Sequence, residues 1–263
     1  MYYIYALILG LVQGVTEFLP ISSSGHLLLL PRIFNFADQG LAVDAVLHLA
    51  TALAIVLYFR NEWWRMLRNW RKSMALRKIA IGSIPAALVG VVFGDLIESI
   101  FRSPWVVVVT LITVGILMWL VERNYTEVKV LETAKKNEIV SVDWPEAILM
   151  GLVQPIALIP GVSRSGITLI TGMWRNVNRV SAAKFTFLLS VPASLGAGLV
   201  KMGDLFTASN TDWLFVGIAG LTTFVVAFFS IHWLLKYLQT NTLKPFVIYR
   251  IALALIVAVI LLV

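Results

Sequence analysis

The sequence contains no cysteine, and only 13% of its residues are charged. The absence of cysteine excludes disulfide bonds, thiolate metal sites and cysteine nucleophiles. A soluble domain normally carries about 25% charged residues, so the scarcity of charge argues against a soluble globular fold. Nucleic-acid binding is also disfavoured, although the net charge is +7, because the main cluster of basic residues, at 60–78, is interleaved with tryptophans as at a membrane interface.

Charge is missing altogether from four long stretches, and hydrophobic residues make up 59% of the chain. These stretches lie between Lys78 and Asp95, Arg102 and Glu122, Lys184 and Lys201, and Asp212 and Lys236. Each approaches the length of roughly 17–25 residues that a helix needs to cross a hydrocarbon core. We therefore expect an all-α polytopic membrane protein.

The first apolar stretch is not typical of a secretory signal. No basic residue precedes it, and Gln13 and Glu17 interrupt it. We therefore expect this stretch to remain in the mature protein.

The second half of the chain repeats the first half at an offset of 141 residues. Matching positions include the tetrapeptide Gly10–Gln13, which recurs as Gly151–Gln154, and Pro104, which recurs as Pro245. A shared tetrapeptide together with further matches at one offset indicates an internal duplication. We expect a single membrane domain, 1–263, with repeat 1 at about 1–121, a polar linker at 122–144 and repeat 2 at about 145–263.

Each repeat contains one broken hairpin followed by three apolar segments. We expect hairpins at 3–34 and 145–176, and crossings at 42–59, 79–94, 104–121, 183–201, 213–235 and 245–262. The second limb of the first hairpin is too short for a full crossing at about 1.5 Å per residue, which favours a re-entrant pair. Because three crossings are an odd number, the second repeat enters the membrane upside down. The prediction is thus inverted-topology repeats, each a re-entrant helix hairpin plus three transmembrane helices.

The loop at 60–78 carries a cluster of seven basic residues, namely Arg60, Arg65, Arg68, Arg71, Lys72, Arg77 and Lys78. The positive-inside rule places this loop in the cytoplasm, where it can touch anionic lipid head groups. The loops at 95–103 and 202–212 and both termini then lie outside.

The two hairpin tips hold the polar groups that interrupt the apolar pattern. In the first tip, Gln13 and Glu17 share one helix face, Pro20 ends that helix, and a Ser/Gly turn leads to His26. The second tip repeats the turn and adds Arg164. Two helix N-termini, several hydroxyls and a guanidinium together predict a site for phosphate groups. We assign substrate binding to the polar and turn residues of both tips, namely Gln13, Ser22, Ser24, Gly25, Gly161, Ser163, Ser165, Gly166 and Thr168.

Phosphate binding alone requires neither Glu17 nor His26. A carboxylate beside a phosphate repels it unless the carboxylate binds a divalent cation or acts as a base. His26 is a candidate nucleophile or proton donor. The tips therefore favour phosphoryl transfer on a lipid phosphate. A lipid flippase or transporter is the alternative, because inverted repeats and broken helices are also typical of transporters.

Other polar residues in the apolar segments have simpler interpretations. We expect Asp44 and His48 to be loop-edge and packing groups, and Gln154 to be structural. We place His232 and Arg250 at the membrane interface, because each lies near the end of an apolar run.

Three motifs in order resemble those of the undecaprenyl-diphosphatase family, also known as bacitracin-resistance proteins. The first is Gln13-x-x-x-Glu17, the second is Ser22-Ser-Ser-Gly-His26, and the third runs from Pro160-Gly-x-Ser-Arg-Ser to Thr168. Length and hydropathy agree over the whole chain. One departure is Ala50, where the family pattern has glycine after His-Leu, which concerns only helix packing at that point.

The resemblance implies an integral-membrane phosphatase that hydrolyses undecaprenyl diphosphate to the monophosphate and phosphate. Such an enzyme recycles the carrier lipid for the cell wall at the outer face of the cell membrane, and it confers bacitracin resistance. The family's active-site positions correspond to Glu17, His26, Ser23 and Arg164, with Gln13 in support. The resemblance also implies a divalent cation, Mg²⁺ or Ca²⁺, with Glu17 as its ligand. Our preferred arrangement has Glu17 with the cation, while Arg164 and the tip N–H groups stabilise the phosphoryl group. The nucleophile stays open between His26, Ser23 and water, and a homodimer is a further expectation.

Overall fold

The computed structural model describes residues 2–34, 36, 38–125, 142–207 and 211–262. Across these ranges the chain is helical and contains no strand. The helices are α1 (Tyr2–Thr16), α2 (Ser23–Ile33), α3 (Leu41–Tyr58), α4 (Arg60–Arg68), α5 (Met74–Phe101), α6 (Pro104–Asn124), α7 (Trp144–Val153), the 3-10 helix η1 (Gln154–Leu158), α8 (Arg164–Trp174), α9 (Arg179–Thr207), α10 (Trp213–Tyr237) and α11 (Lys244–Leu262). Most of the predicted linker, 126–141, lies outside the described residues.

Five of these helices are long and apolar enough to cross a membrane, which identifies a multi-pass membrane protein. They are α3, α5, α6, α10 and α11, and they coincide with five of the six predicted crossings. The sixth prediction, 183–201, falls within α9, which has 29 residues and contains Pro192. Over the residues that the structure describes, α9 is not one of these five helices.

Each predicted hairpin consists of two short helices separated by an irregular turn. The first pairs α1 with α2, and the second pairs α7 and η1 with α8. In the second hairpin the α-helix gives way to a 3-10 helix at Gln154, directly before Pro155. The proline ring cannot donate a backbone hydrogen bond and crowds the carbonyl four residues earlier, so the α-helical ladder ends there.

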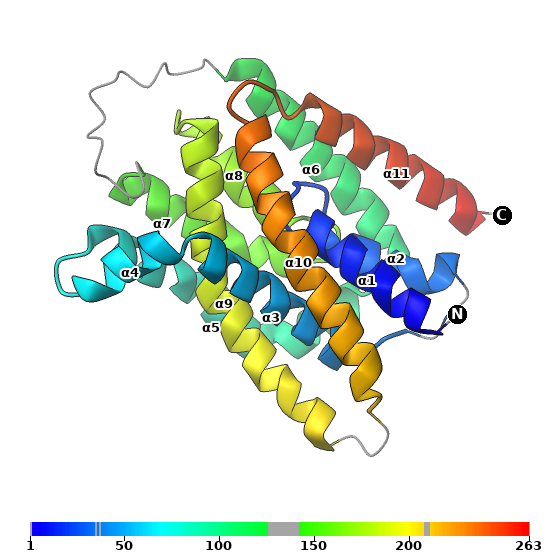
Figure 1. The fold of residues 1–263 in the computed structure, drawn as a ribbon. Coiled ribbons are helices and arrows are strands. Elements are labelled where there is room, and N and C mark those ends of the chain that lie inside the picture. The colour runs from blue at the N-terminus through cyan, green and yellow to red at the C-terminus, as the bar shows by residue number, and fades with distance from the viewer. Residues whose placement is uncertain (1, 35, 37, 126–141, 208–210, 263) are drawn as a thin grey trace.

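The hairpins pack against helices from the other half of the chain (Figure 1). α1 lies along α10, and α7 with η1 lies along α5, while α3 packs on α9 and α6 on α11. The repeated tetrapeptide explains two of these contacts. A Cβ on Gly10 would lie 2.7 Å from the Ala219 carbonyl oxygen, and a Cβ on Gly151 would lie 2.5 Å from the Gly82 carbonyl oxygen. Glycine is therefore required in both copies, because the backbones approach each other directly.

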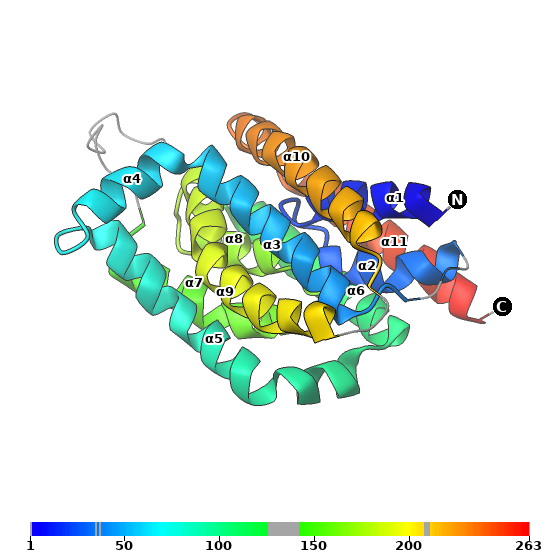
Figure 2. The ribbon, with the colours of Figure 1, turned by 60° about the horizontal axis from the view of Figure 1, so that its bottom comes forward.

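The two chain termini and helix α4 lie at opposite ends of the bundle (Figures 1 and 2). The beginning of α1 and the end of α11 lie at one end of the molecule, whereas α4 lies at the opposite end (Figures 1 and 2). The tips of the two hairpins lie between these ends.

Arg250 of α11 joins the two hairpin turns, and our expectation of an interfacial side chain was wrong. Its side chain is fully buried, at 0% exposure. The guanidinium donates hydrogen bonds to backbone carbonyls of the first turn, the second turn and α6. The acceptors are Pro20 (3.2 Å), Gly161 (2.8 Å), Val162 (3.2 Å), Thr110 (3.2 Å) and Leu111 (3.3 Å). His232, by contrast, is exposed, and its ring Nδ1 lies 3.2 Å from the Tyr58 hydroxyl. Its position at the membrane interface stays a prediction.

We predict that Arg250→Met destabilises the protein by about 3–5 kcal/mol, because it leaves several buried carbonyls without a donor. The unfolding midpoint of purified protein in detergent measures this loss. Arg250→Lys is the matched control, since it keeps the charge and part of the hydrogen bonding, and its midpoint should lie between those of the other two proteins. An Arg250→Met midpoint equal to that of the wild type would contradict the structural role.

Candidate functional site

The two hairpin turns have the same backbone conformation and the same serine cap. Ser22 and Ser163 each precede a helix with positive φ angles, 76° and 73° respectively. The Ser22 hydroxyl accepts a hydrogen bond from the Gly25 N–H (3.3 Å), and the Ser163 hydroxyl accepts one from the Gly166 N–H (3.1 Å). Each serine thus caps its helix from a conformation that glycine normally adopts, and the hydroxyl compensates for the strain.

The turns touch each other directly. The Ser165 hydroxyl of the second turn donates a hydrogen bond to the Leu19 carbonyl of the first turn (3.1 Å). Gly161 has φ 89°, and a Cβ there would lie 2.0 Å from the Thr110 hydroxyl oxygen, so only glycine fits. The N-termini of α2 and α8 therefore lie side by side, where their N–H groups can serve one anion.

Glu17 lies at the point where the two halves meet, and its side chain is only 9% exposed. Arg164, from the second half, donates a hydrogen bond to Glu17 Oε1 at 2.6 Å. Ser23 donates one to Oε2 at 2.6 Å, and the Gln13 amide donates one to the same oxygen at 3.2 Å. The structure therefore brings together four of the residues singled out from the two tips. The roles given to them stay predictions.

His48 also reaches Glu17, although the sequence was interpreted as placing it in packing. Its Nδ1 lies 3.3 Å from Glu17 Oε2 and 3.2 Å from the Gln13 amide nitrogen. An imidazole within a predicted crossing was itself the signal, because ionisable groups at membrane depth are costly and commonly functional. Asp44 stays at the edge of α3, as expected, where its carboxylate accepts a hydrogen bond from Gln39 (2.7 Å).

His26 faces another part of the molecule. Its Nδ1 lies 2.6 Å from the Ser22 carbonyl, which can only accept, so Nδ1 carries the ring proton. Nε2 then accepts a hydrogen bond from the Tyr249 hydroxyl at 2.7 Å. The structure does not pair His26 with Glu17, and the predicted catalytic role of His26 stays a prediction.

The remaining predicted binding residues support the turns. The Thr168 hydroxyl donates to the Arg164 carbonyl at 2.7 Å, and the Ser24 and Ser22 hydroxyls lie 3.3 Å apart. Gln154, expected to be structural, donates to the Gly82 carbonyl (3.0 Å) in the interior.

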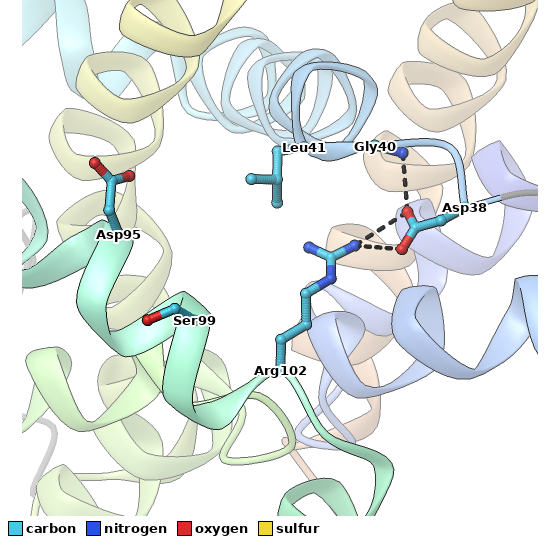
Figure 3. Close-up of a pocket in the computed structure, with 6 residues that line it drawn as sticks. All are labelled: Asp38, Gly40, Leu41, Asp95, Ser99 and Arg102. Atoms are coloured by element: carbon cyan, nitrogen blue, oxygen red, sulfur yellow. Dashed lines mark hydrogen bonds and ion pairs between the residues drawn. The ribbon is translucent and has the colours of Figure 1, made fainter.

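A small cavity of about 10 Å³ opens beside the Glu17–Arg164 pair. Its lining residues come from the first turn, α8 and α9, namely Glu17, Phe18, Arg164, Ser165, Thr186, Phe187 and Ser190. A larger cavity of about 470 Å³ lies elsewhere, between the segment before α3 that holds Asp38 and the end of α5 near Asp95 and Arg102 (Figure 3). We do not assign the site to the larger cavity, because two carboxylates line it and Arg102 is already bound to Asp38 at 2.7 Å.

The described residues contain no cluster of three or more histidine, aspartate or glutamate side chains that could hold a metal ion. Glu17 is the one carboxylate lining the cavity beside Arg164. Mg²⁺ is commonly held by one or two carboxylates together with substrate phosphates and water. The donor set therefore fits a cation that binds together with a diphosphate better than a resident ion.

Comparison with known proteins places these residues in a family. Residues 6–256 match the model of the family described as bacitracin resistance protein BacA. The chain belongs to this family.

Several curated relatives are similar over nearly the whole chain. A protein of Marinobacter nauticus named undecaprenyl-diphosphatase is 40% identical, with 95% of each chain covered. One of a Nocardioides species with the same name is 39% identical, covering 95% of this chain and 93% of the relative. Undecaprenyl-diphosphatase 2 of Stutzerimonas stutzeri is 38% identical, with 97% of each chain covered. Both hairpin tips of this family member lie within the matched range.

The Asp38–Arg102 ion pair beside the larger cavity gives a pH-dependent prediction. Burial alone would raise the pKa of Asp38, but the Gly40 N–H and the Arg102 guanidinium outweigh it and hold this pKa below its usual value. The stabilisation is therefore complete above about pH 4 and is lost as the pH falls through the lowered pKa. Asp38→Asn should lower stability at pH 7 by at most about 1 kcal/mol, because the pair is partly exposed.

Unfolding midpoints at pH 7 and near pH 3 test this prediction. The difference between wild type and Asp38→Asn should shrink at the lower pH. Asp95→Asn is the control. Its carboxylate is 93% exposed, and its distance to Lys201 Nζ, 3.4 Å, is longer than that between Asp38 and Arg102. A difference that does not change with pH would argue against the ion pair as its source.

Proposed function

We propose that this protein hydrolyses a polyprenyl diphosphate, of the undecaprenyl type, to the monophosphate and phosphate. The observation that carries the proposal is one buried carboxylate, Glu17, bonded both to the Ser23 hydroxyl and to the Arg164 guanidinium. Phosphoryl transfer needs a nucleophile, a base beside it and positive groups that bind the phosphoryl oxygens. Here these are the Ser23 hydroxyl, the Glu17 carboxylate, and the Arg164 guanidinium with the two helix N-termini. The names of the relatives support the same activity.

In the proposed reaction, Ser23 is the nucleophile and Glu17 is its base. The 2.6 Å hydrogen bond from the Ser23 hydroxyl to Glu17 supports this assignment. Ser23 Oγ attacks the terminal phosphorus, and its proton passes through Glu17 to the oxygen of the departing lipid monophosphate. Water then cleaves the Ser23–phosphate bond and releases phosphate. Arg164 and the N–H groups of the turns bind the phosphoryl oxygens throughout.

In the proposed reaction, the Glu17–Arg164 ion pair opens when the substrate phosphate binds. In the structure described, Arg164 neutralises Glu17 at 2.6 Å. When phosphate oxygens engage Arg164, the guanidinium is drawn away from Glu17 Oε1, while Oε2 keeps its hydrogen bond to Ser23. Oε1 is then free to contact the divalent cation that accompanies the diphosphate.

We further propose a divalent cation, Mg²⁺ or Ca²⁺, with Glu17 as the residue of this chain that contacts it. A cation of this kind offsets the negative charge of the diphosphate.

We infer that the two halves are inverted-topology repeats with re-entrant hairpins. The packing supports this inference, because α3 meets α9 and α6 meets α11, and each pair comprises helices 141 residues apart. α1 on α10 and α7 on α5 form a second matched pair of contacts. In the proposed orientation, α4 and loop 60–78 are cytoplasmic and the site opens to the outer side of the cell membrane.

The exposed face of α4 suits contact with anionic lipid head groups. Arg65 and Arg68 lie in its last turn, Trp64 within it is 68% exposed, and Trp70 directly after it is 59% exposed. Basic and tryptophan side chains together are typical of the membrane interface.

The homodimer stays a prediction. The flippase alternative is not favoured, because the relatives are named as diphosphatases.

Phosphate release by the purified protein tests the activity. With Mg²⁺ or Ca²⁺, wild type should release phosphate from the lipid diphosphate but not from the monophosphate, and a chelator should stop the release. Glu17→Gln, Ser23→Ala and Arg164→Lys should each lower kcat at least about 100-fold. Ser230→Ala is the control, since within the described part of the chain its hydroxyl bonds the Val226 carbonyl of its own helix and no group of the site. No release by folded wild type would overturn the proposal.

Single cysteines test the orientation, because the chain has none of its own. In cells with an intact cytoplasmic membrane, an impermeant maleimide should label Ser99→Cys and spare Arg68→Cys. Permeabilisation should expose Arg68→Cys to the reagent. The reverse pattern would invert the proposed topology.

A further inference from the structure

The small cavity beside Glu17 has the size and lining of a site for one water molecule. Its volume is about 10 Å³, close to the space that a single bound water requires. Glu17, Arg164, Ser165, Thr186 and Ser190 supply polar groups to its wall. Buried waters typically make about three hydrogen bonds, and this wall offers enough partners.

Thr186 provides an independent observation, because its hydroxyl is buried without a partner. The side chain is 3% exposed, and its Oγ1 has no hydrogen-bond partner within the described residues. Hydroxyls in apolar helices normally bond the carbonyl one turn earlier, as Ser83 does with Ile79 and Thr171 with Ile167. A buried hydroxyl that forgoes such a bond loses free energy unless something else binds it. Thr186 lines the cavity, so a water there would satisfy its hydroxyl.

Ser190 lies one helical turn after Thr186 on α9 and lines the same cavity. Its hydroxyl donates to the Phe187 carbonyl at 2.8 Å, which leaves its oxygen able to accept. Glu17 connects the cavity to Ser23. Its Oε1 accepts a hydrogen bond from Arg164, which also lines the cavity, and its Oε2 accepts one from the Ser23 hydroxyl.

We propose that Thr186 and Ser190 hold the water that completes hydrolysis, placed against Glu17 on the side of Arg164. The proposal rests on the proposed function and assigns this water to its second step. The water oxygen attacks the phosphorus of the phosphoserine formed at Ser23, and one water proton moves to Glu17. The bond between phosphorus and Ser23 Oγ breaks, Glu17 returns the proton to Oγ, and hydrogen phosphate leaves.

Rapid-quench kinetics with a lipid diphosphate labelled in its terminal phosphate separate the two steps. Thr186→Val removes the hydroxyl at nearly constant volume, whereas Thr186→Ser keeps it. We expect Thr186→Val to lower the steady-state kcat by about tenfold or more, the effect of losing one positioning hydrogen bond. It should still release about one equivalent of lipid monophosphate per site in a burst and accumulate label on Ser23. Thr186→Ser should behave like the wild type.

The outcomes distinguish this proposal from the function on which it rests. Two results for Thr186→Val would overturn the water site. One is a kcat equal to that of the wild type, and the other is a lowered kcat with neither a burst of lipid monophosphate nor label on Ser23. Wild type that releases no phosphate would instead overturn the proposed function. Unfolding midpoints show whether Thr186→Val folds. If it does not, Ser190→Ala replaces it, with a smaller loss of about threefold and the same accumulation of label expected.

Discussion

The structure depends on one buried guanidinium that ties together three separate parts of the chain. Arg250 donates to carbonyls of the first turn, the second turn and α6. Helix ends and irregular turns leave carbonyls without partners, and the surrounding hydrocarbon cannot satisfy them. A planar group with five donors can satisfy several of these carbonyls at once. The same group places a positive charge behind two turns that are proposed to bind phosphate.

The two halves share the geometry of their turns but differ in the polar groups at the two tips. Both turns keep the serine cap and its positive φ angle. At the offset of 141 residues, however, Glu17 corresponds to Leu158, and Arg164 corresponds to Ser23. Each half therefore supplies the same serine-capped turn, while the proposed base comes from one half and the guanidinium from the other. The ion pair between them forms only when both halves are in place.

Much of the site could be predicted from the sequence, because the duplication revealed that two distant breaks belong together. The meeting of Glu17 and Arg164 follows from that pairing. Arg250 was misplaced because its distance from the end of an apolar run does not reveal how deeply α11 is buried. His48 was discounted because helical spacing cannot show what faces it. The cavity at Thr186 could not have been found, since sequence does not show whether a helix hydroxyl bonds its own backbone.

The glycine contacts between the hairpins and their neighbouring helices have a mechanical consequence. At Gly151 the backbone of α7 approaches the Gly82 backbone of α5 so closely that a Cβ would lie 2.5 Å from its carbonyl oxygen. Sliding α7 along α5 by one residue would bring a side chain into that contact, and the same holds for Gly10 of α1 against α10. Each hairpin is thus locked in register to a helix of the other half. A hairpin that shifts along its own axis must therefore carry its neighbouring helix, α10 or α5, with it.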